Sequence, residues 1–211
     1  MKIKKNIKVI FWDFDGVIID SMHVRDFGFK EIFKEYDSQL VKKLINYHRL
    51  NGGLSRYVKI RYFFEEILNQ NISEEELIRY AYNFSSIMRN ELVKKKYLIS
   101  DSINFIKNNF NNFNFHIVSG SDHKELLFLN KELQISKFFL SINGSPTPKN
   151  EIVRQLIHKF RYNENEIAMI GDSINDYEAA KSNNIKFYGY NNDDLKSLDS
   201  YIKTFTSFKF L

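Results

Sequence analysis

The chain has 211 residues, which allows one large domain or a core with a small inserted domain. It is 43% hydrophobic, enough for a sizeable core, and carries a formal net charge of +5. Its lysines are scattered and form no dense basic block. We therefore expect no nucleic-acid partner. The absence of cysteine excludes disulfides and thiol chemistry. No stretch is long enough to span a membrane and no signal peptide is predicted, so we expect a cytoplasmic protein.

The first predicted element is a strand that begins near Val9. Residues 9–12 are β-branched or aromatic, which is typical of a strand buried on both faces. Asp13 and Asp15 follow two residues apart, so on an extended backbone their side chains point the same way. Two carboxylates at the end of a buried strand are costly without a positive partner, and a divalent cation is the simplest one. Gly16 then permits a sharp turn and the close approach of a ligand; a solvated Asp-Gly turn is the plainer alternative.

The next part of the chain, residues 21–96, contains no convincing strand. Apolar residues recur there at helical spacing. Ser73, with Glu76 three residues later, is typical of a capping box that opens one of these helices. In an α/β chain, an all-helical stretch between the first and second strands is best explained as an insertion.

A glycine-rich loop interrupts these helices at residues 51–56, Asn-Gly-Gly-Leu-Ser-Arg. Ser55 is a suitable N-cap for the following helix. The guanidinium of Arg56 could bind a phosphate or carboxylate with two hydrogen bonds. The alternative is that this loop is only a helix–helix turn. His23, just after the first motif, is predicted to be a hinge or helix residue, with substrate contact as its alternative.

A second strand is predicted at residues 113–118, after a helix at residues 102–109. Ser119 and Gly120 follow this strand, before a helix that starts near Asp122. A hydroxyl, a backbone N–H and a helix N-terminus at the carboxyl end of a strand together make an anion site. A capping turn without a ligand is the alternative.

A third strand is predicted at residues 138–142, followed by a turn at residues 143–148. Lys149 then opens a helix that runs to about Phe160. A lysine at a helix N-terminus opposes the macrodipole, which favours a functional role over that of a solvated surface lysine.

A fourth strand is predicted at residues 167–170. Asp172 and Asp176 follow it, so two carboxylates again lie at the carboxyl end of a strand, four residues apart across the start of a helix. Residues 185–190 are predicted to form another strand, and residues 201–205 a last edge strand.

These stretches carry a resemblance to a known family. Residues 13–21, Asp-Phe-Asp-Gly-Val-Ile-Ile-Asp-Ser, resemble the first motif of the haloacid dehalogenase-like hydrolases, in the phosphoglycolate phosphatase/β-phosphoglucomutase branch. Ser119-Gly120, Lys149 and residues 171–176 resemble the second, third and fourth motifs, in family order. The second aspartate, absent from the true dehalogenases, points to phosphoryl transfer.

The resemblance assigns roles to the residues of the motifs. It implies that Asp13 is the nucleophile, that Asp15 is the general acid/base, and that Ser119 holds the transferring phosphoryl group. Lys149 would neutralise the charge of the nucleophile and the phosphate, and Gly16 and Gly120 would lie against the substrate. It also implies Mg²⁺ as cofactor, which prefers hard oxygen ligands. The ligands would be the Asp13 carboxylate, the Asp15 carbonyl and Asp172, with Asp176 orienting water or Lys149.

The resemblance also implies an architecture. We expect an α/β fold, a Rossmann-like parallel sheet with helices on both faces and an inserted all-α cap. The catalytic core would comprise residues 1–20 and 97–211, and the cap residues 21–96. The loop around Arg56 resembles a cap loop whose arginine grips the non-reacting phosphate of the substrate. Arg25 departs from the mutase pattern, which has a substrate-contacting histidine there.

The predicted function is a Mg²⁺-dependent phosphatase that hydrolyses a small phosphorylated metabolite, such as a sugar phosphate or a phosphoglycolate-like compound, through an aspartyl-phosphate. A sugar phosphomutase of the β-phosphoglucomutase type is the alternative. A response-regulator receiver also has a phosphorylatable aspartate, but it needs neither the helical insertion nor Asp15. We expect a monomer or weak dimer, and the specific substrate is not encoded in the motifs.

Overall fold

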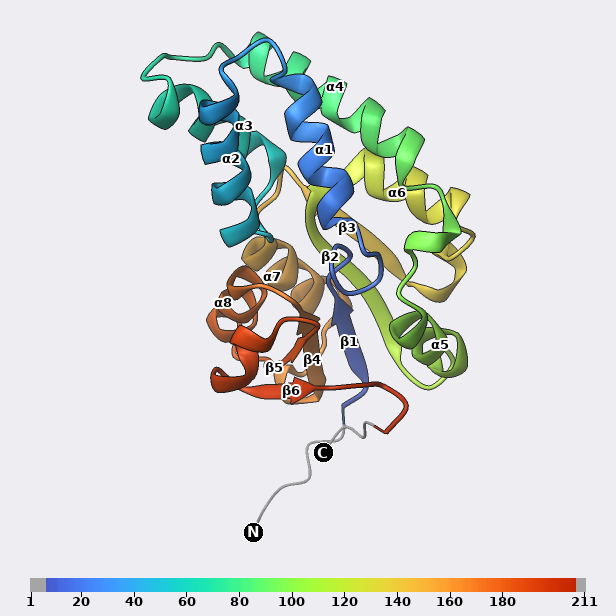
Figure 1. The fold of residues 1–211 in the computed structure, drawn as a ribbon. Helices are drawn as coiled ribbons and strands as arrows, with labels where there is room; N and C mark the ends of the chain where they lie inside the picture. Colours follow the sequence, from blue (N-terminus) through green and yellow to red (C-terminus); the bar gives the residue numbers. More distant parts are fainter. Residues whose placement is uncertain (1–6, 208–211) are drawn as a thin grey trace.

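A computed structural model of the chain describes residues 7–207 and shows a parallel sheet of six strands in the order β3-β2-β1-β4-β5-β6 (Figure 1). The lysines of the N-terminal residues 1–6 lie outside the described residues. The strands are β1 Val9–Trp12, β2 Asn114–Asp122, β3 Ser141–Ser145, β4 Ile167–Gly171, β5 Lys186–Tyr190 and β6 Ser200–Ile202. The predicted α/β parallel sheet is therefore confirmed.

The first strand lies in the middle of the sheet because its apolar residues are buried on both faces. All four residues of β1 are buried, and β1 pairs in parallel with β2 on one side and with β4 on the other. Strand order reverses at β1, and an open α/β sheet binds ligands at the carboxyl ends of the strands beside such a point. The residues that follow β1 are thus placed at the ligand-binding edge.

Helices cover both faces of the sheet, as predicted. The helices are α1 Met22–Ile32, α2 Ser38–Leu50, α3 Arg56–Tyr62, α4 Glu74–Glu91, α5 Ser100–Asn109, α6 His123–Glu132, α7 Lys149–Phe160 and α8 Ile174–Ser182, with a π-helical turn η1 at Phe63–Ile67. One core cluster joins α5 and α6 to the even-numbered residues of β1, and a second joins α7 and α8 to the odd-numbered ones. This alternation follows from the two-residue period of a strand.

The helices α1 to α4, called here the helical segment, lie above the carboxyl edge of the sheet (Figure 1). The two chain connections to this segment are hydrogen-bonded to each other. Asp20 N–H donates to the Tyr97 carbonyl at 2.8 Å, and Ile99 N–H donates to the Ile18 carbonyl at 2.9 Å. The segment therefore leaves and rejoins the sheet domain at one place, which is the geometry of an insertion.

Local capping signals were predicted correctly. Ser73 and Glu76 form the capping box at the start of α4, and Ser55 Oγ accepts a hydrogen bond from Val58 N–H at the start of α3. No helix within residues 7–207 is both long enough and apolar enough to cross a membrane.

Three strand predictions had wrong bounds. Strand β2 was expected to end at residue 118, but it continues through Ser119 and Gly120 to Asp122. Residues 136–138, partly read as the start of a strand, form a 3₁₀ turn, and β3 begins only at Ser141. The strand then continues through Asn143 and Gly144, which were read as a turn; a Cβ on Gly144 would lie 2.3 Å from the Ser121 carbonyl oxygen, so only glycine fits there. The last strand is Ser200–Ile202 and does not reach Phe205, whose ring packs 5.3 Å from that of Trp12.

Candidate active site

The predicted catalytic residues meet at the carboxyl ends of three adjacent strands. Asp13 directly follows β1, Ser119 lies within β2, and Asp172 directly follows β4. Lys149 is the first residue of α7 and is buried. Because neighbouring parallel strands end at the same edge, residues more than 100 positions apart in the sequence share one site.

Three carboxylates form a cluster at this edge, of which Asp13 and Asp176 are buried and Asp172 is partly buried. Oxygen atoms of Asp13, Asp172 and Asp176 lie within 4.8 Å of one another. Lys149 Nζ lies 3.0 Å from Asp13 Oδ1 and donates a short hydrogen bond to Asp176. Burial and the negative charge of Asp176 raise the pKa of Asp13 to about 7, and burial together with Asp13 raises that of Asp172. Although burial opposes it, the charges of Asp13 and Asp176 raise the pKa of Lys149.

The cluster fits a divalent cation. One ammonium cannot balance three carboxylates, two of them buried, and the raised pKa values of Asp13 and Asp172 reflect this excess of negative charge. Asp13 Oδ1 is buried, and the Lys149 ammonium lies 3.0 Å from it. Gly16 has φ +75°, and a Cβ there would lie 1.8 Å from Asp172 Oδ2, so glycine makes room for that carboxylate. Oxygen-rich, compact sites of this kind suit Mg²⁺.

Asp176 has both carboxylate oxygens occupied by protein groups. Oδ1 accepts from Lys149, and Oδ2 accepts from Ser173 N–H at 3.1 Å and from Ser173 Oγ at 2.6 Å. A carboxylate used in this way orients its neighbours more readily than it binds a metal, which supports the predicted role of Asp176 as a residue that positions Lys149.

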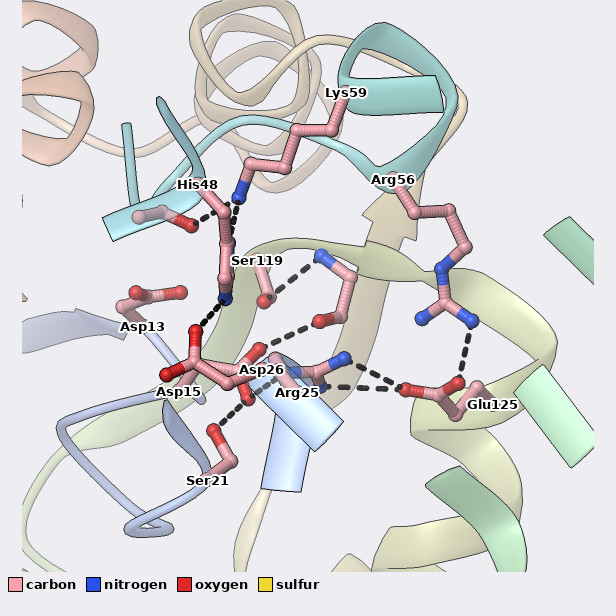
Figure 2. Close-up of polar contacts among 12 residues, drawn as sticks. Asp13, Asp15, Ser21, Arg25, Asp26, His48, Arg56, Lys59, Ser119 and Glu125 are labelled. Carbon is pink, nitrogen blue, oxygen red and sulfur yellow. Dashed lines mark hydrogen bonds and ion pairs between the residues drawn. The ribbon is translucent and has the colours of Figure 1, made fainter. Parts of the chain in front are cut away.

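Asp15 is held by hydroxyl and guanidinium donors (Figure 2). Arg25 Nε donates to Asp15 Oδ1 at 2.6 Å, and Ser121 Oγ donates to Oδ2 at 2.5 Å. Ser21 Oγ donates a further short hydrogen bond to Oδ1. Burial by itself would raise the pKa of Asp15, but the charge and hydrogen bonds of Arg25, with those of the two serines, lower it. Asp15 is therefore fixed in position and favoured as the ionised base.

Ser119 and Gly120 lie where the helical segment contacts the sheet domain. Ser119 is buried, and its Oγ accepts from Ser121 N–H at 3.2 Å. A Cβ on Gly120 would lie 2.1 Å from the Gly53 carbonyl oxygen of the glycine-rich loop. The two glycines thus allow backbone to approach backbone, and the loop covers the carboxyl edge of the sheet.

A small cavity of about 20 Å³ lies between the helical segment and the sheet domain. Asp13, Asp15, Ser119, Gly120 and Arg56 all line it. The structure therefore brings these predicted residues together around one space. Lys149 adjoins it through its contact with Asp13.

Arg56 lines this cavity but already has a carboxylate partner. Its Nη1 donates to Glu125 Oε2 at 2.6 Å and to Ser85 Oγ at 2.5 Å. Its guanidinium also lies 4.8 Å from the ring centre of Phe84. Arg25 donates to the other oxygen of Glu125, Oε1, at 3.3 Å. Contact between Arg56 and substrate stays a prediction, because the Arg56 guanidinium is already paired with the Glu125 carboxylate.

Sequence reasoning missed several residues of the site. Ser121, Lys59 and His48 line or approach the cavity, and Glu125 binds two arginines. Lys59 follows Arg56 by three residues, a spacing that puts both on one helix face and could have indicated it. Glu125 gave no such signal, since its partners lie in distant helices. His23 is exposed and packs 5.3 Å from the ring of Tyr97, which agrees with a hinge or helix residue.

Comparisons with known proteins bear on this geometry. The model of the haloacid dehalogenase-like hydrolase family matches residues 7–184. Among solved structures, β-phosphoglucomutase from Clostridium difficile has a TM-score of 0.75 at 20% identity, covering 97% of this chain and 94% of its own. A predicted phosphoglycolate phosphatase from Haemophilus somnus has a TM-score of 0.73 at 17% identity, covering 94% and 95%.

A third similar structure is the putative hydrolase YfnB from Bacillus subtilis bound to magnesium, with a TM-score of 0.71 at 15% identity, covering 95% of this chain and 96% of its own. A search of curated proteins gave no match. At these identities the solved structures establish the fold, and the family match establishes the class. The chain belongs to the haloacid dehalogenase-like hydrolases.

Proposed function

We propose that this protein is a Mg²⁺-dependent phosphatase that hydrolyses a small phosphorylated metabolite through an aspartyl-phosphate. The observation that carries the proposal is the environment of Asp13. Its carboxylate is buried, Oδ1 lies 3.0 Å from the Lys149 ammonium, and the side chain lines a small cavity. Asp15 lines the same cavity, held by Arg25. A nucleophile beside a positioned acid/base is the minimal equipment for covalent phosphoryl transfer.

The proposed reaction has two steps. A carboxylate oxygen of Asp13 attacks phosphorus, the ester P–O bond breaks, and Asp15 gives a proton to the leaving oxygen. Asp15 then takes a proton from water, whose oxygen attacks the phosphoryl group, and inorganic phosphate leaves Asp13. Ser119 Oγ and the Lys149 ammonium would stabilise the phosphoryl oxygens. The contact of Asp15 with Arg25 favours the ionised base of the second step.

The metal would be held by the carboxylates of Asp13 and Asp172 and by the carbonyl of Asp15. Bound there, it would neutralise charge on the phosphate and on the acid cluster. The magnesium present in the similar YfnB structure supports this choice.

We also propose that residues 21–96 act as a cap domain over a core of residues 1–20 and 97–211. The paired connections at Asp20–Tyr97 and Ile18–Ile99 would let the segment move as a unit. Closure would exclude water from the phosphoryl group before the second step. The specificity for substrate would then come from the cap, because the core residues recognise only the phosphoryl group.

A sugar phosphomutase is the alternative, supported by the structural likeness to β-phosphoglucomutase. A mutase would use the same residues but return the phosphoryl group to the sugar. The presence of Arg25 in place of a histidine weakens this alternative.

The test is a panel of phosphorylated metabolites assayed with purified protein and Mg²⁺, measuring both free phosphate and isomerised sugar phosphate. Release of phosphate from at least one metabolite supports the phosphatase. Isomerisation without release supports the mutase. If neither product forms from any monoester, including p-nitrophenyl phosphate, the proposal is wrong.

A further inference from the structure

Lys59 is a buried cation that has no carboxylate partner among residues 7–207. The other buried basic side chains at this site each have one: Arg25 pairs with Asp15, Arg56 with Glu125, and Lys149 with Asp13. Lys59 is only 2% exposed, yet the ion pairs among the described residues do not include it. A buried charge is costly unless it is paired, so this ammonium is either neutralised or placed to meet an anion.

The pKa of Lys59 agrees with a missing anion. Burial and the positive charge of Arg25 lower it to about 7, against the weaker opposing effect of Asp15. Arg25, which does have carboxylate partners, is shifted in the opposite direction. The difference lies in the partners, since both groups are buried.

Polar groups position the Lys59 ammonium (Figure 2). Nζ lies 2.9 Å from His48 Nδ1 and donates to the Gly52 carbonyl at 3.3 Å. A protonated lysine has only hydrogens to give, so Nδ1 accepts and the neutral imidazole carries its hydrogen on Nε2. Burial and the charge of Lys59 lower the pKa of His48 to about 2, which keeps the ring neutral.

The other ring nitrogen of His48 lies near the carboxylate of Asp26. His48 Nε2 lies 3.8 Å from Asp26 Oδ1, beyond hydrogen-bond distance, and neither buried atom has a hydrogen-bond partner among residues 7–207. Asp26 Oδ2 in turn accepts from Arg49 at 2.9 and 2.6 Å. The surface arginine, Asp26, His48 and Lys59 therefore lie in a row, with hydrogen bonds at its two ends and a 3.8 Å gap between Asp26 and His48.

Lys59 borders the cavity from the helical segment. Lys59 lines the same cavity as Asp15 and Ser119 but comes from the helical segment on the opposite wall (Figure 2). Arg56 lines this wall too, and its Nε and Nη2 atoms are buried without partners. The transferring phosphoryl group would lie by Asp13 and Ser119, so whatever meets Lys59 belongs to the rest of the substrate.

We propose that Lys59 binds a second anionic group, a carboxylate or a phosphate, on the leaving part of the substrate, and that His48 and Asp26 are positioning residues for its ammonium. A neutral polyol would leave the buried charge uncompensated, whereas an anion would balance it. This inference rests on the proposed phosphatase function and adds the class of substrate to it.

The test compares matched substrates with and without the second anion. 2-Phosphoglycolate against ethyl phosphate examines a carboxylate, and glucose 1,6-bisphosphate against glucose 1-phosphate examines a phosphate. The expected result is that kcat/KM is at least tenfold higher for the dianionic member of one pair. In Lys59→Met that ratio should fall about tenfold to a hundredfold, the loss expected when a charged hydrogen bond is removed, and mainly through KM. Lys59→Arg should recover part of it.

Controls separate recognition from folding. Lys43 is exposed on α2, so Lys43→Met should leave the ratio unchanged. His48→Gln should raise KM for the dianionic substrate more than for its partner, whereas a purely structural role would change both equally. If the wild type hydrolyses both members of each pair with equal kcat/KM, the inference is wrong but the proposed phosphatase function still stands, and no variant is needed to show this. An unchanged ratio in folded Lys59→Met would also overturn it. If no monoester is hydrolysed, the proposed function fails and the inference with it.

Discussion

The substitution Gly53→Ala tests whether closure of the helical segment is required for turnover. A Cβ at this position would lie 2.6 Å from Ser173 Oγ and 2.7 Å from Asn175 Cβ, both in the sheet domain. Ser173 cannot turn away freely, because its Oγ donates to Asp176 at 2.6 Å. The contact must therefore be relieved by moving the loop away from the sheet domain.

The size of the effect follows from this overlap. Forcing an extra methyl group into a packed contact costs about 1–3 kcal/mol. If only the closed state bears this cost, its population relative to the open state falls about 5- to 150-fold. We expect kcat/KM on the best metabolite of the panel to fall by a similar factor. The melting temperature should change little, because the open form avoids the overlap.

The neighbouring glycine provides a matched control. A Cβ on Gly52 would have Met22 Cε, at 3.8 Å, as its nearest contact, which is ordinary van der Waals distance. Gly52→Ala should therefore retain kcat/KM within about twofold while changing the unfolded chain in the same way as Gly53→Ala. Steady-state kinetics and small-angle scattering on both variants provide the comparison. Equal activity of the two variants would refute the argument that this contact belongs to the catalytic state.

Four further outcomes are expected. Asp13→Asn should abolish phosphate release while leaving circular dichroism and melting temperature intact, because it removes the nucleophile and also a carboxylate that burial and Asp176 disfavour; near wild-type activity of the folded variant would exclude Asp13 as nucleophile. A chelator should remove activity and Mg²⁺ should restore it, whereas Ca²⁺ should substitute poorly owing to its looser coordination; full activity in excess chelator would contradict the metal site. Arg56→Met should lower the free energy of unfolding by about 1–3 kcal/mol, because it breaks a buried charged hydrogen bond to Glu125. It should reduce activity on p-nitrophenyl phosphate as well as on the metabolite. Loss of activity on the metabolite alone, with an unchanged melting temperature, would instead favour direct contact between Arg56 and substrate. His48 stays neutral in the folded protein but protonates at its ordinary pKa of 6.5 in the unfolded chain, so below pH 6.5 it should lower the free energy of unfolding by at most about 1.4 kcal/mol per pH unit. In urea unfolding between pH 7 and 4.5, the free energy of unfolding should therefore fall less steeply in His48→Gln than in the wild type. Equal slopes in the two proteins would contradict this.

The sequence alone determined the parts of this protein that depend on local spacing. Asp13 and Asp15 follow an apolar strand, Ser119 lies in the last part of a second, and Asp172 follows another; a parallel sheet brings such carboxyl ends to one edge whatever the details of packing. The helical segment was predictable because helical periodicity extends over residues 21–96 without a strand. The capping box at Ser73 was predictable because it requires only four consecutive residues.

The tertiary structure alone decided which charges pair. Arg56 and Glu125 are 69 residues apart, and Ser121 and Asp15 are 106 apart, so no local pattern could predict either contact. The same holds for the start of β3, where the register against β2 overrides an apolar Phe-Phe pair. Pairing in a buried site depends on which side chains converge after folding, because burial makes every unpaired charge costly. Arg56, the cation singled out from the sequence, pairs with the Glu125 carboxylate. Lys59, which sequence reasoning passed over, has no carboxylate partner in the part of the chain that the structure describes.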